Sequence, residues 1–250
     1  SDVCSSDLGE CTMFFWSLLL AHVIADFPLQ TDSIFRLKTK YSWGVLPHVL
    51  ICSAMNTLVL LPYLSNVSSW TAIVVLGIVH IILDRTKISV SEKIARDNFF
   101  QFFIDQVLHV LSIWLVAIWL SNVVDQSAYF ASGIWANRAL FIQLTAYVFA
   151  AFAGVPIIYY ARKFWFIEVK KSNESVDYPN FLQRVPGYFE RFLATLGVVW
   201  GGWWLLLTVG AFVPRLLLKW RDDDSANTRI SAIVGFVVSL LCGVIVHLFI

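Results

Sequence analysis

Three pairs of histidine and aspartate, each with a spacing of four residues, lie within otherwise apolar stretches of this sequence. The pairs are His22 with Asp26, His80 with Asp84, and Asp105 with His109. In an α-helix, residues four apart lie on the same face, so each pair would present an imidazole and a carboxylate together. Ionisable side chains in membrane-length apolar segments are costly and are usually functional. The pairs therefore indicate a metal-binding or proton-transferring site.

Neutral imidazole and carboxylate groups are suitable ligands for a divalent metal ion such as zinc, manganese or iron. The predicted ligands are His22, Asp26, His48, His80, Asp84, Asp105 and His109. This set exceeds what one tetrahedral ion needs. It could serve two ions about 3.5–4 Å apart, or some carboxylates could orient a ligating histidine.

Two further roles are predicted around this ligand set. The carboxylates predicted to be catalytic are Asp26, Asp84 and Asp105, one of which would act as a general base outside the metal shell. The polar residues predicted to contact an anionic substrate or a lipid phosphate are Gln30, Lys38, Lys87 and Gln106.

The composition indicates that these residues are held by membrane-embedded helices. Of the 250 residues, 58% are hydrophobic and only 14% are charged, and the mean hydropathy is +0.72. A soluble domain is usually about a quarter charged. The net charge of +1 gives no sign of a nucleic-acid partner, so the predicted partners are membrane lipid and an anionic amphiphile as substrate.

Seven apolar segments are predicted, which makes the fold class an all-α, multi-pass transmembrane helical bundle. Their approximate bounds are 13–30, 44–63, 70–84 with an extension to 87, 99–120, 138–160, 188–213 and 230–250. The runs are continuous rather than alternating, which disfavours a membrane β-barrel. The fifth segment is expected to be kinked near Gly154 and Pro156.

The loop charges predict an orientation in the bacterial inner membrane. Basic residues concentrate in the loops after the first, third and fifth segments, which the positive-inside rule places in the cytoplasm. All three pairs then lie at one depth, near the cytoplasmic face. The basic loop after 188–213 breaks this pattern. Either that segment reverses at Gly201 and Gly202, or the three aspartates at 222–224 offset the basic residues.

The predicted domain organisation follows from the distribution of the pairs. Residues 1–12 are set aside as an artefact or disordered leader, because SDVCSSDLG resembles a translated sequencing adapter. Residues 13–121 form a four-helix His/Asp-bearing unit, 122–137 an external loop, and 138–250 a three-segment membrane appendage. Cys52 and Cys242 fall inside apolar segments without ligand spacing, and are predicted to be small buried residues rather than half-cystines.

The N-terminal part resembles the bacterial membrane family called domain of unknown function 3307. The matching pieces are LLLAHVIADFPLQTD at 18–32, a lysine at Lys38 or Lys40, PHVLI at 47–51, GIVHIILDRTK at 77–87 and FFIDQVLHVLSIWL at 102–115. GYFERFL at 187–193 is similar to a Glu-Arg motif of the family's C-terminal half. The resemblance implies a multi-pass membrane protein but no particular reaction. By analogy, the His/Asp pattern is also similar to that of the membrane-bound metal-dependent hydrolases.

Three functions remain open at this point. The first is a metal-dependent hydrolase acting on a phosphoester, ester or amide of an amphiphile. The second is a transporter or channel for a divalent cation or proton, and the third is a structural partner whose pairs lock helices together. The outer halves of the second and third segments are nearly apolar apart from Asn56 and Thr57, which argues against a polar path across the membrane.

Overall fold

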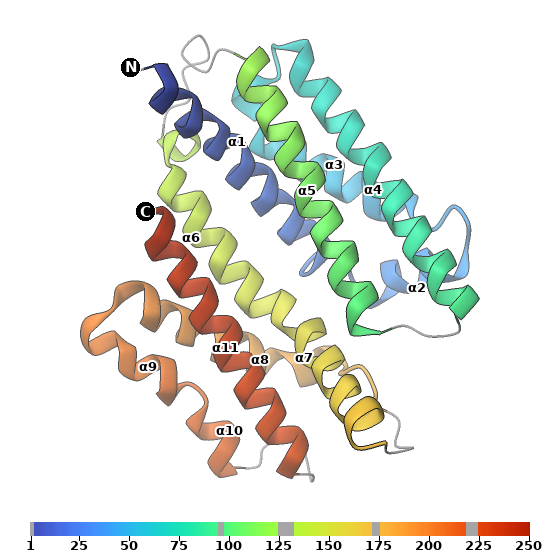
Figure 1. Ribbon diagram of the computed structural model, residues 1–250, viewed down its shortest axis with the longest axis vertical. Helices are drawn as coiled ribbons and strands as arrows, with labels where there is room; N and C mark the ends of the chain where they lie inside the picture. Colours follow the sequence, from blue (N-terminus) through green and yellow to red (C-terminus); the bar gives the residue numbers. More distant parts are fainter. Residues whose placement is uncertain (1–2, 95–97, 125–132, 172–175, 219–224) are drawn as a thin grey trace. The chain divides into compact units, whose positions relative to one another are not determined.

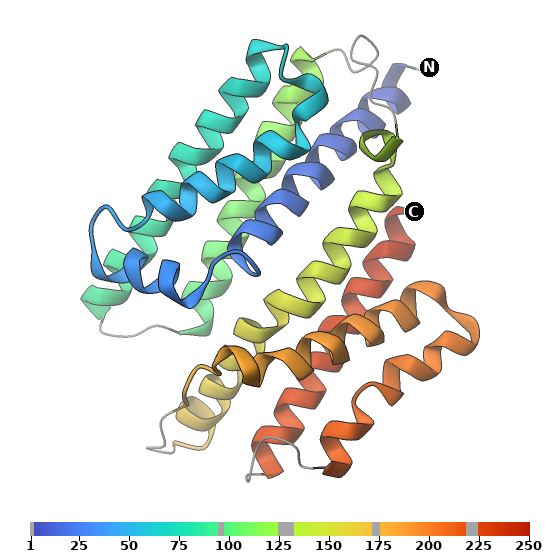
Figure 2. The same cartoon turned by 180° about the vertical axis from the view of Figure 1, so that it is seen from behind.

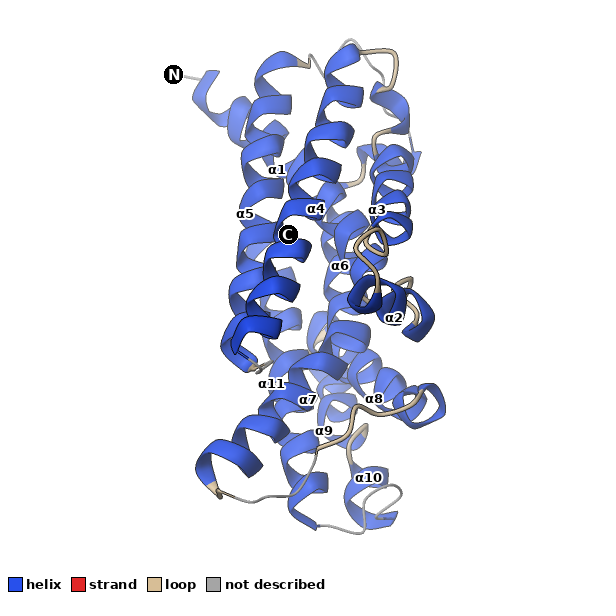
Figure 3. Ribbon diagram, turned by 90° about the vertical axis from the view of Figure 1, so that its right-hand side faces the viewer, coloured by secondary structure: helices blue, strands red, loops and turns tan. Residues whose placement is uncertain are grey.

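The computed structural model describes residues 3–94, 98–124, 133–171, 176–218 and 225–250. Within these ranges the ordered elements are all helical and no strand occurs (Figure 3). The predicted all-α class is confirmed. Of the segment set aside at 1–12, the structure describes only the backbone from Val3 onward. Most of the predicted external loop at 122–137 lies outside the described residues.

Contacts between Cα atoms divide the chain into two compact units, Ser1–Thr145 and Ala146–Ile250. The helices of the first unit are α1 (Val3–Asp26), α2 (Asp32–Lys40), α3 (Leu46–Val59), α4 (Val67–Ile94) and α5 (Phe99–Val123), with the short turns η1 (Leu61–Tyr63) and η3 (Gly133–Ala136). Helix α6 (Arg138–Val148) crosses from the first unit into the second.

The four long helices of the first unit form a closed ring. Helix α1 packs against α3 and α5, and α4 packs against the same two helices, as Figures 1 and 2 show from opposite sides. Successive long helices run in opposite directions. Apolar side chains such as Leu18, Ala72 and Leu120 are fully buried in this unit, so the ring encloses one core. A polar group that faces its centre must find a partner there.

Helix α2 was not predicted from the sequence, where its residues were assigned to a loop. Thr31 caps it, with the side-chain oxygen accepting from the Ile34 N–H at 3.4 Å. Asp32 in its first turn and Lys40 in its last turn complement the helix dipole. Figure 2 shows α2 beside the end of the ring where α1 ends and α3 begins. Its Lys38 is buried.

The second unit is irregular at two places. Its elements are the π-helical turn η4 (Phe149–Ala153), α7 (Gly154–Lys163), the π-helical turn η5 (Phe164–Val169), α8 (Phe181–Trp200), η6 (Gly202–Trp204), α9 (Leu205–Gly210), α10 (Val213–Leu218) and α11 (Ser225–Phe249). The irregular turn η4 immediately precedes Gly154, in agreement with the predicted kink. The Arg191 guanidinium donates to the Ala150 and Ala151 carbonyls there, at 2.7 and 2.6 Å.

The predicted sixth segment, 188–213, is not one continuous helix but contains the C-terminal part of α8, the turn η6 and α9, and ends at the first residue of α10. Gly201 and Gly202 have φ angles of 64° and 55°, which L-residues with a side chain rarely adopt. The chain reverses there and α9 packs against α8. The Thr208 hydroxyl donates to the Ala194 carbonyl at 3.2 Å. The sequence offered two explanations for the basic loop after this segment, a reversal at Gly201 and Gly202 or an offset by the aspartates at 222–224. The structure contains the reversal.

Four of the described helices are long and apolar enough to cross a membrane. They are Val67–Lys93, Phe99–Val123, Arg138–Val169 and Thr228–Phe249. Three further apolar helices are shorter, Met13–Asp26, Leu46–Val59 and Gly202–Leu217. The structure therefore indicates a membrane protein, but it does not confirm the predicted seven spans, because a full crossing takes about 20 residues.

We expect Gly44→Ala to destabilise the first unit. Gly44 is buried where the chain turns from α2 into α3, and an added Cβ would overlap the Leu37 carbonyl. Overpacking of this kind costs about 1–3 kcal/mol, so the thermal unfolding midpoint in detergent should fall. Gly210→Ala is the matched control. Open space surrounds Gly210 on α9, and alanine is the better helix former, so its midpoint should hold or rise. Equal midpoints for both variants would show that the turn tolerates a side chain.

Candidate metal centre

In three of the four ring helices, α1, α3 and α5, the polar residues lie near a helix end. Helix α1 ends at Asp26, two residues before Pro28, so its pair occupies the last two turns. Pro47 opens α3, which places His48 in the first turn. The Asn98 side chain caps α5 by accepting from the Gln101 N–H at 3.0 Å, and Asp105 follows in the second turn. Only α4 carries its pair well inside a long helix.

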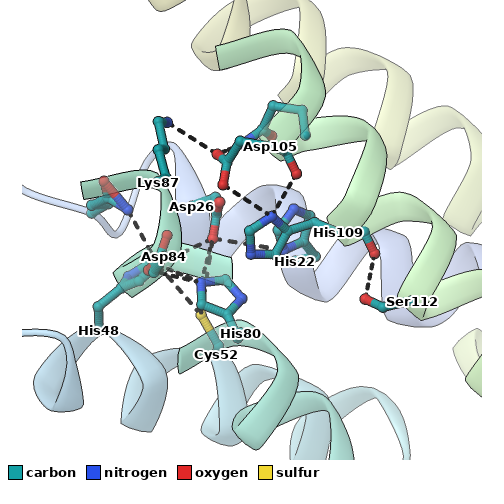
Figure 4. A network of polar contacts seen from close by, with 12 residues as sticks. His22, Asp26, His48, Cys52, His80, Asp84, Lys87, Asp105, His109 and Ser112 are labelled. Atoms are coloured by element: carbon teal, nitrogen blue, oxygen red, sulfur yellow. Dashed lines mark hydrogen bonds and ion pairs between the residues drawn. The ribbon is translucent and has the colours of Figure 1, made fainter. Parts of the chain in front are cut away.

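The ring brings all seven predicted ligands together in its interior (Figure 4). None of their side chains is more than 7% exposed. The residues are His22, Asp26, His48, His80, Asp84, Asp105 and His109. Since buried polar groups are costly unless they are paired, this burial requires that the groups satisfy one another or a bound ion.

Four of the donor atoms surround a common point. The Nε2 atoms of His48 and His80 are 3.0 Å apart and lie 3.2 and 3.6 Å from Asp26 Oδ1. The Cys52 Sγ atom lies 3.7 Å from His48 Nε2, 3.9 Å from His80 Nε2 and 4.0 Å from Asp26 Oδ1. These six separations are the edges of a tetrahedron of two nitrogens, one oxygen and one sulfur.

The tetrahedron has the dimensions of a transition-metal site. Nitrogen or oxygen ligands at about 2.0–2.1 Å from a tetrahedral ion lie about 3.3–3.4 Å apart, and a sulfur ligand at about 2.3 Å lies about 3.5–3.6 Å from them. The three nitrogen and oxygen edges, at 3.0, 3.2 and 3.6 Å, fall on both sides of the first value. The three sulfur edges, at 3.7, 3.9 and 4.0 Å, are each slightly longer than the second. Without an ion, two imidazole nitrogens, a carboxylate oxygen and a sulfur would converge with few protons to share. The donor set therefore fits a zinc-class ion.

A second group of possible ligands lies beside the first. His80, Asp84 and His109 each offer a ligand atom within 4.8 Å of the others. The His109 Nδ1–H donates to the Asp105 carbonyl at 2.8 Å, which leaves Nε2 as the lone-pair nitrogen. Within the described residues that Nε2 has no hydrogen-bond partner, and neither does His22 Nε2. The His22 and His109 rings are stacked with centroids 5.1 Å apart.

The four polar residues predicted to contact substrate all lie at this cluster. Gln30 Nε2 is 3.2 Å from His48 Nε2, and Lys38 Nζ is 2.6 Å from Asp84 Oδ2. Lys87 and Gln106 both donate to Asp105 Oδ2, at 3.0 and 3.1 Å. In the structure their head groups therefore contact the imidazole and carboxylate groups of the cluster.

Lys38 is the most deeply buried of these four residues, at 7% exposure. Burial opposes its charge, but the carboxylates of Asp84, Asp26 and Asp105 outweigh that effect and hold the pKa of Lys38 above its usual value. Lys38 therefore carries its full positive charge inside the first unit. Lys87 differs, because its side chain is 24% exposed.

Sequence reasoning did not find Cys52 as a member of the cluster. The residue is buried, as predicted, at 5% exposure, but its Sγ supplies the fourth corner of the tetrahedron. A signal was present in the sequence, because Cys52 follows His48 at the same spacing of four that marks the three pairs. The search for His/Asp pairs alone passed over it.

Residues 14–136 match the family model described as "Protein of unknown function (DUF3307)". The match confirms the resemblance seen in the sequence, and it covers every residue of the cluster. No curated protein and no solved structure matches the chain. The chemistry of the cluster must therefore be argued from its geometry.

Cobalt(II) should report the sulfur corner directly. We expect protein loaded with Co²⁺ to show a thiolate-to-metal absorption band in the near ultraviolet and intense visible bands typical of tetrahedral coordination. Cys52→Ser should lose the near-ultraviolet band. Cys242→Ser is the matched control, since Cys242 is also buried and free but belongs to the second unit. A near-ultraviolet band that persists in the Cys52 variant would remove sulfur from the ligand set.

Proposed function

We propose, for a chain whose residues 14–136 form a domain of this family, that the first unit holds one divalent ion of the zinc class. The proposed ligands are Asp26, His48, Cys52 and His80. We further propose that the ion serves a hydrolase of the bacterial inner membrane, acting on a phosphoester, ester or amide of an anionic amphiphile.

The observation that carries this proposal is the tetrahedral arrangement of four donor atoms from three helices. Asp26 comes from α1, His48 and Cys52 from α3, and His80 from α4. The spacing of four within one helix cannot produce such an arrangement, because it controls only pairs within that helix. Convergence of soft and hard donors in a buried space is typical of a transition-metal site.

The remaining groups can act on a substrate at that ion. When bound, such an ion would polarise the scissile group and favour attack by water. Asp84 lies outside the tetrahedron, with Oδ2 at 3.4 Å from His80 Nε2 and 4.0 Å from His48 Nε2. We propose that it accepts a proton near the reacting atoms, once Lys38 has left its Oδ2 atom. Asp105 is the other carboxylate outside the tetrahedron and is the second proposed proton acceptor.

Substrate contact is assigned to the more exposed members of the polar set. Lys87, Gln106 and Gln30 are each partly exposed, and Lys87 would attract an anionic head group. Lys38 would have to leave Asp84 before it could meet a substrate. The exposed aromatic residues Phe100 and Phe103, near the start of α5, give an amphiphile's chain apolar surface to lie against.

A transport pathway has less support than hydrolysis. Away from the cluster, three hydroxyl groups on α3 and α4 donate to nearby backbone carbonyls. Thr57 donates to Ser53 O at 2.8 Å, Ser69 to Tyr63 O at 2.8 Å, and Thr71 to Val67 O at 3.1 Å. Side chains bound to nearby carbonyls do not form a relay for an ion or proton. A purely locking role would also leave unexplained the Nε2 atoms of His22 and His109, for which the described residues supply no hydrogen-bond partner.

Elemental analysis tests the metal site. We expect purified wild-type protein to carry about one zinc-class ion per chain, and His48→Ala and His80→Ala to lose it, because each removes a corner of the tetrahedron. His247→Ala is the matched control, since His247 belongs to the second unit and its Nε2–H donates to the Val198 backbone carbonyl at 2.9 Å. Full metal content in both ligand variants would overturn the site.

Hydrolysis is tested separately from metal binding. We expect Asp84→Asn to keep the ion but to lower turnover of long-chain chromogenic esters or phosphoesters by about 10²–10⁴-fold, the usual contribution of a general base. Asp32→Asn, an exposed carboxylate on α2, should retain full turnover. Metal-loaded wild-type protein that turns over none of these substrates in lipid nanodiscs would argue against a hydrolase while leaving the metal site intact.

A further inference from the structure

The charges inside the first unit balance around a single ion. With neutral imidazoles, the three carboxylates and a metal-bound Cys52 thiolate carry four negative charges, and the Lys38 and Lys87 ammonium groups carry two positive charges. One divalent ion neutralises the remaining two negative charges, and a second would leave an excess of two positive charges in an apolar ring. Such an excess is strongly disfavoured.

The positive charge of Lys38 comes from a helix outside the ring. It lies on the short helix α2, where Phe35, Arg36 and Lys40 are exposed. Lys38 is the residue of α2 that is buried, and its Nζ contacts Asp84 Oδ2 at 2.6 Å. Helix α2 therefore carries a tethered cation to the cluster.

The position that Lys38 neutralises has the features of a metal site. Asp84 is 1% exposed and His109 is 2% exposed, and both belong to the group whose ligand atoms lie within 4.8 Å. The lone pair of His109 Nε2 is unshared with any described residue. Neither Asp84 nor His109 forms a corner of the tetrahedron. A carboxylate and an imidazole are thus left over beside the first ion.

We propose that Lys38 occupies a second cation position formed by Asp84 and His109, and thereby restricts the cluster to one divalent ion. This inference rests on the proposed metal site. An ammonium group and a divalent ion compete for the same carboxylate oxygen, and their mutual repulsion in a low-dielectric interior prevents both from binding there. Without the Lys38 charge, one divalent ion leaves one negative charge in excess, and a second ion leaves one positive charge rather than the two that it would leave in the wild type. The second ion also supplies the buried Asp84 carboxylate with a counter-ion.

The test counts ions. Lys38→Met keeps an unbranched side chain, one atom shorter, without the charge, and we expect it to raise the metal content from about one to about two ions per chain when the protein is dialysed against excess Zn²⁺. Lys38→Arg keeps the charge and should remain at the wild-type value. Lys40→Met, two residues away and exposed, is the matched control and should also remain there.

A double variant locates the extra ion. His109→Ala added to Lys38→Met should return the content to the single-ion value, because it removes the imidazole of the second position while leaving the tetrahedron complete. If Lys38→Met is not recovered folded, Lys38→Gln gives the same comparison, since its amide can donate to Asp84 without a charge.

The outcomes separate this inference from the proposed function. A folded, uncharged Lys38 variant that still holds one ion overturns the inference and leaves the metal site standing. A wild-type content of two ions overturns it as well, since Lys38 would then exclude nothing. A wild-type protein that binds no Zn²⁺ overturns the proposed function and this inference together.

Discussion

The first unit depends on a single constraint, which is that imidazoles and carboxylates buried in an apolar helix ring must find partners among themselves or in a bound ion. An isolated buried charge would cost more than the stability of a typical domain. The unit meets this constraint by placing three acids and four imidazoles at one end of the ring, where α2 adds an ammonium group. The helix ends and the turn at Gly44 hold these groups in register.

Much of the site was predictable because the period of a helix is a local property. The spacing of four in His22–Asp26 and in His80–Asp84 indicated that each pair shares one helix face, without any tertiary information. The loop charges indicated that the pairs lie at the same depth in the membrane. What could not be predicted was which atoms meet. That depends on how the ring closes, and it made Cys52 a corner of the tetrahedron and left His22 outside it.

The fold prediction differed from the structure where hydropathy alone was used to assign helices. Helix α2 is short and mostly polar, so hydropathy alone assigned it to a loop, although the Thr31 cap was readable. The segment 188–213 was counted as one apolar segment, with a reversal at Gly201 and Gly202 left open, and the positive φ angles of these two residues reverse the chain there. The buried Glu190–Arg215 pair, with Nη2 to Oε2 at 2.7 Å, joins α10 to α8. It shows that part of the Glu-Arg motif serves the packing of the second unit.

The division of the four corner atoms among helices has a consequence for biogenesis. Asp26, His48 and Cys52 are contributed by the first two ring helices, but the last corner, His80, belongs to the third. A nascent chain emerging from the ribosome therefore lacks the complete set of proposed ligands until α4 has joined its predecessors. On the proposed metal site, metal binding would be a late event in the assembly of this unit.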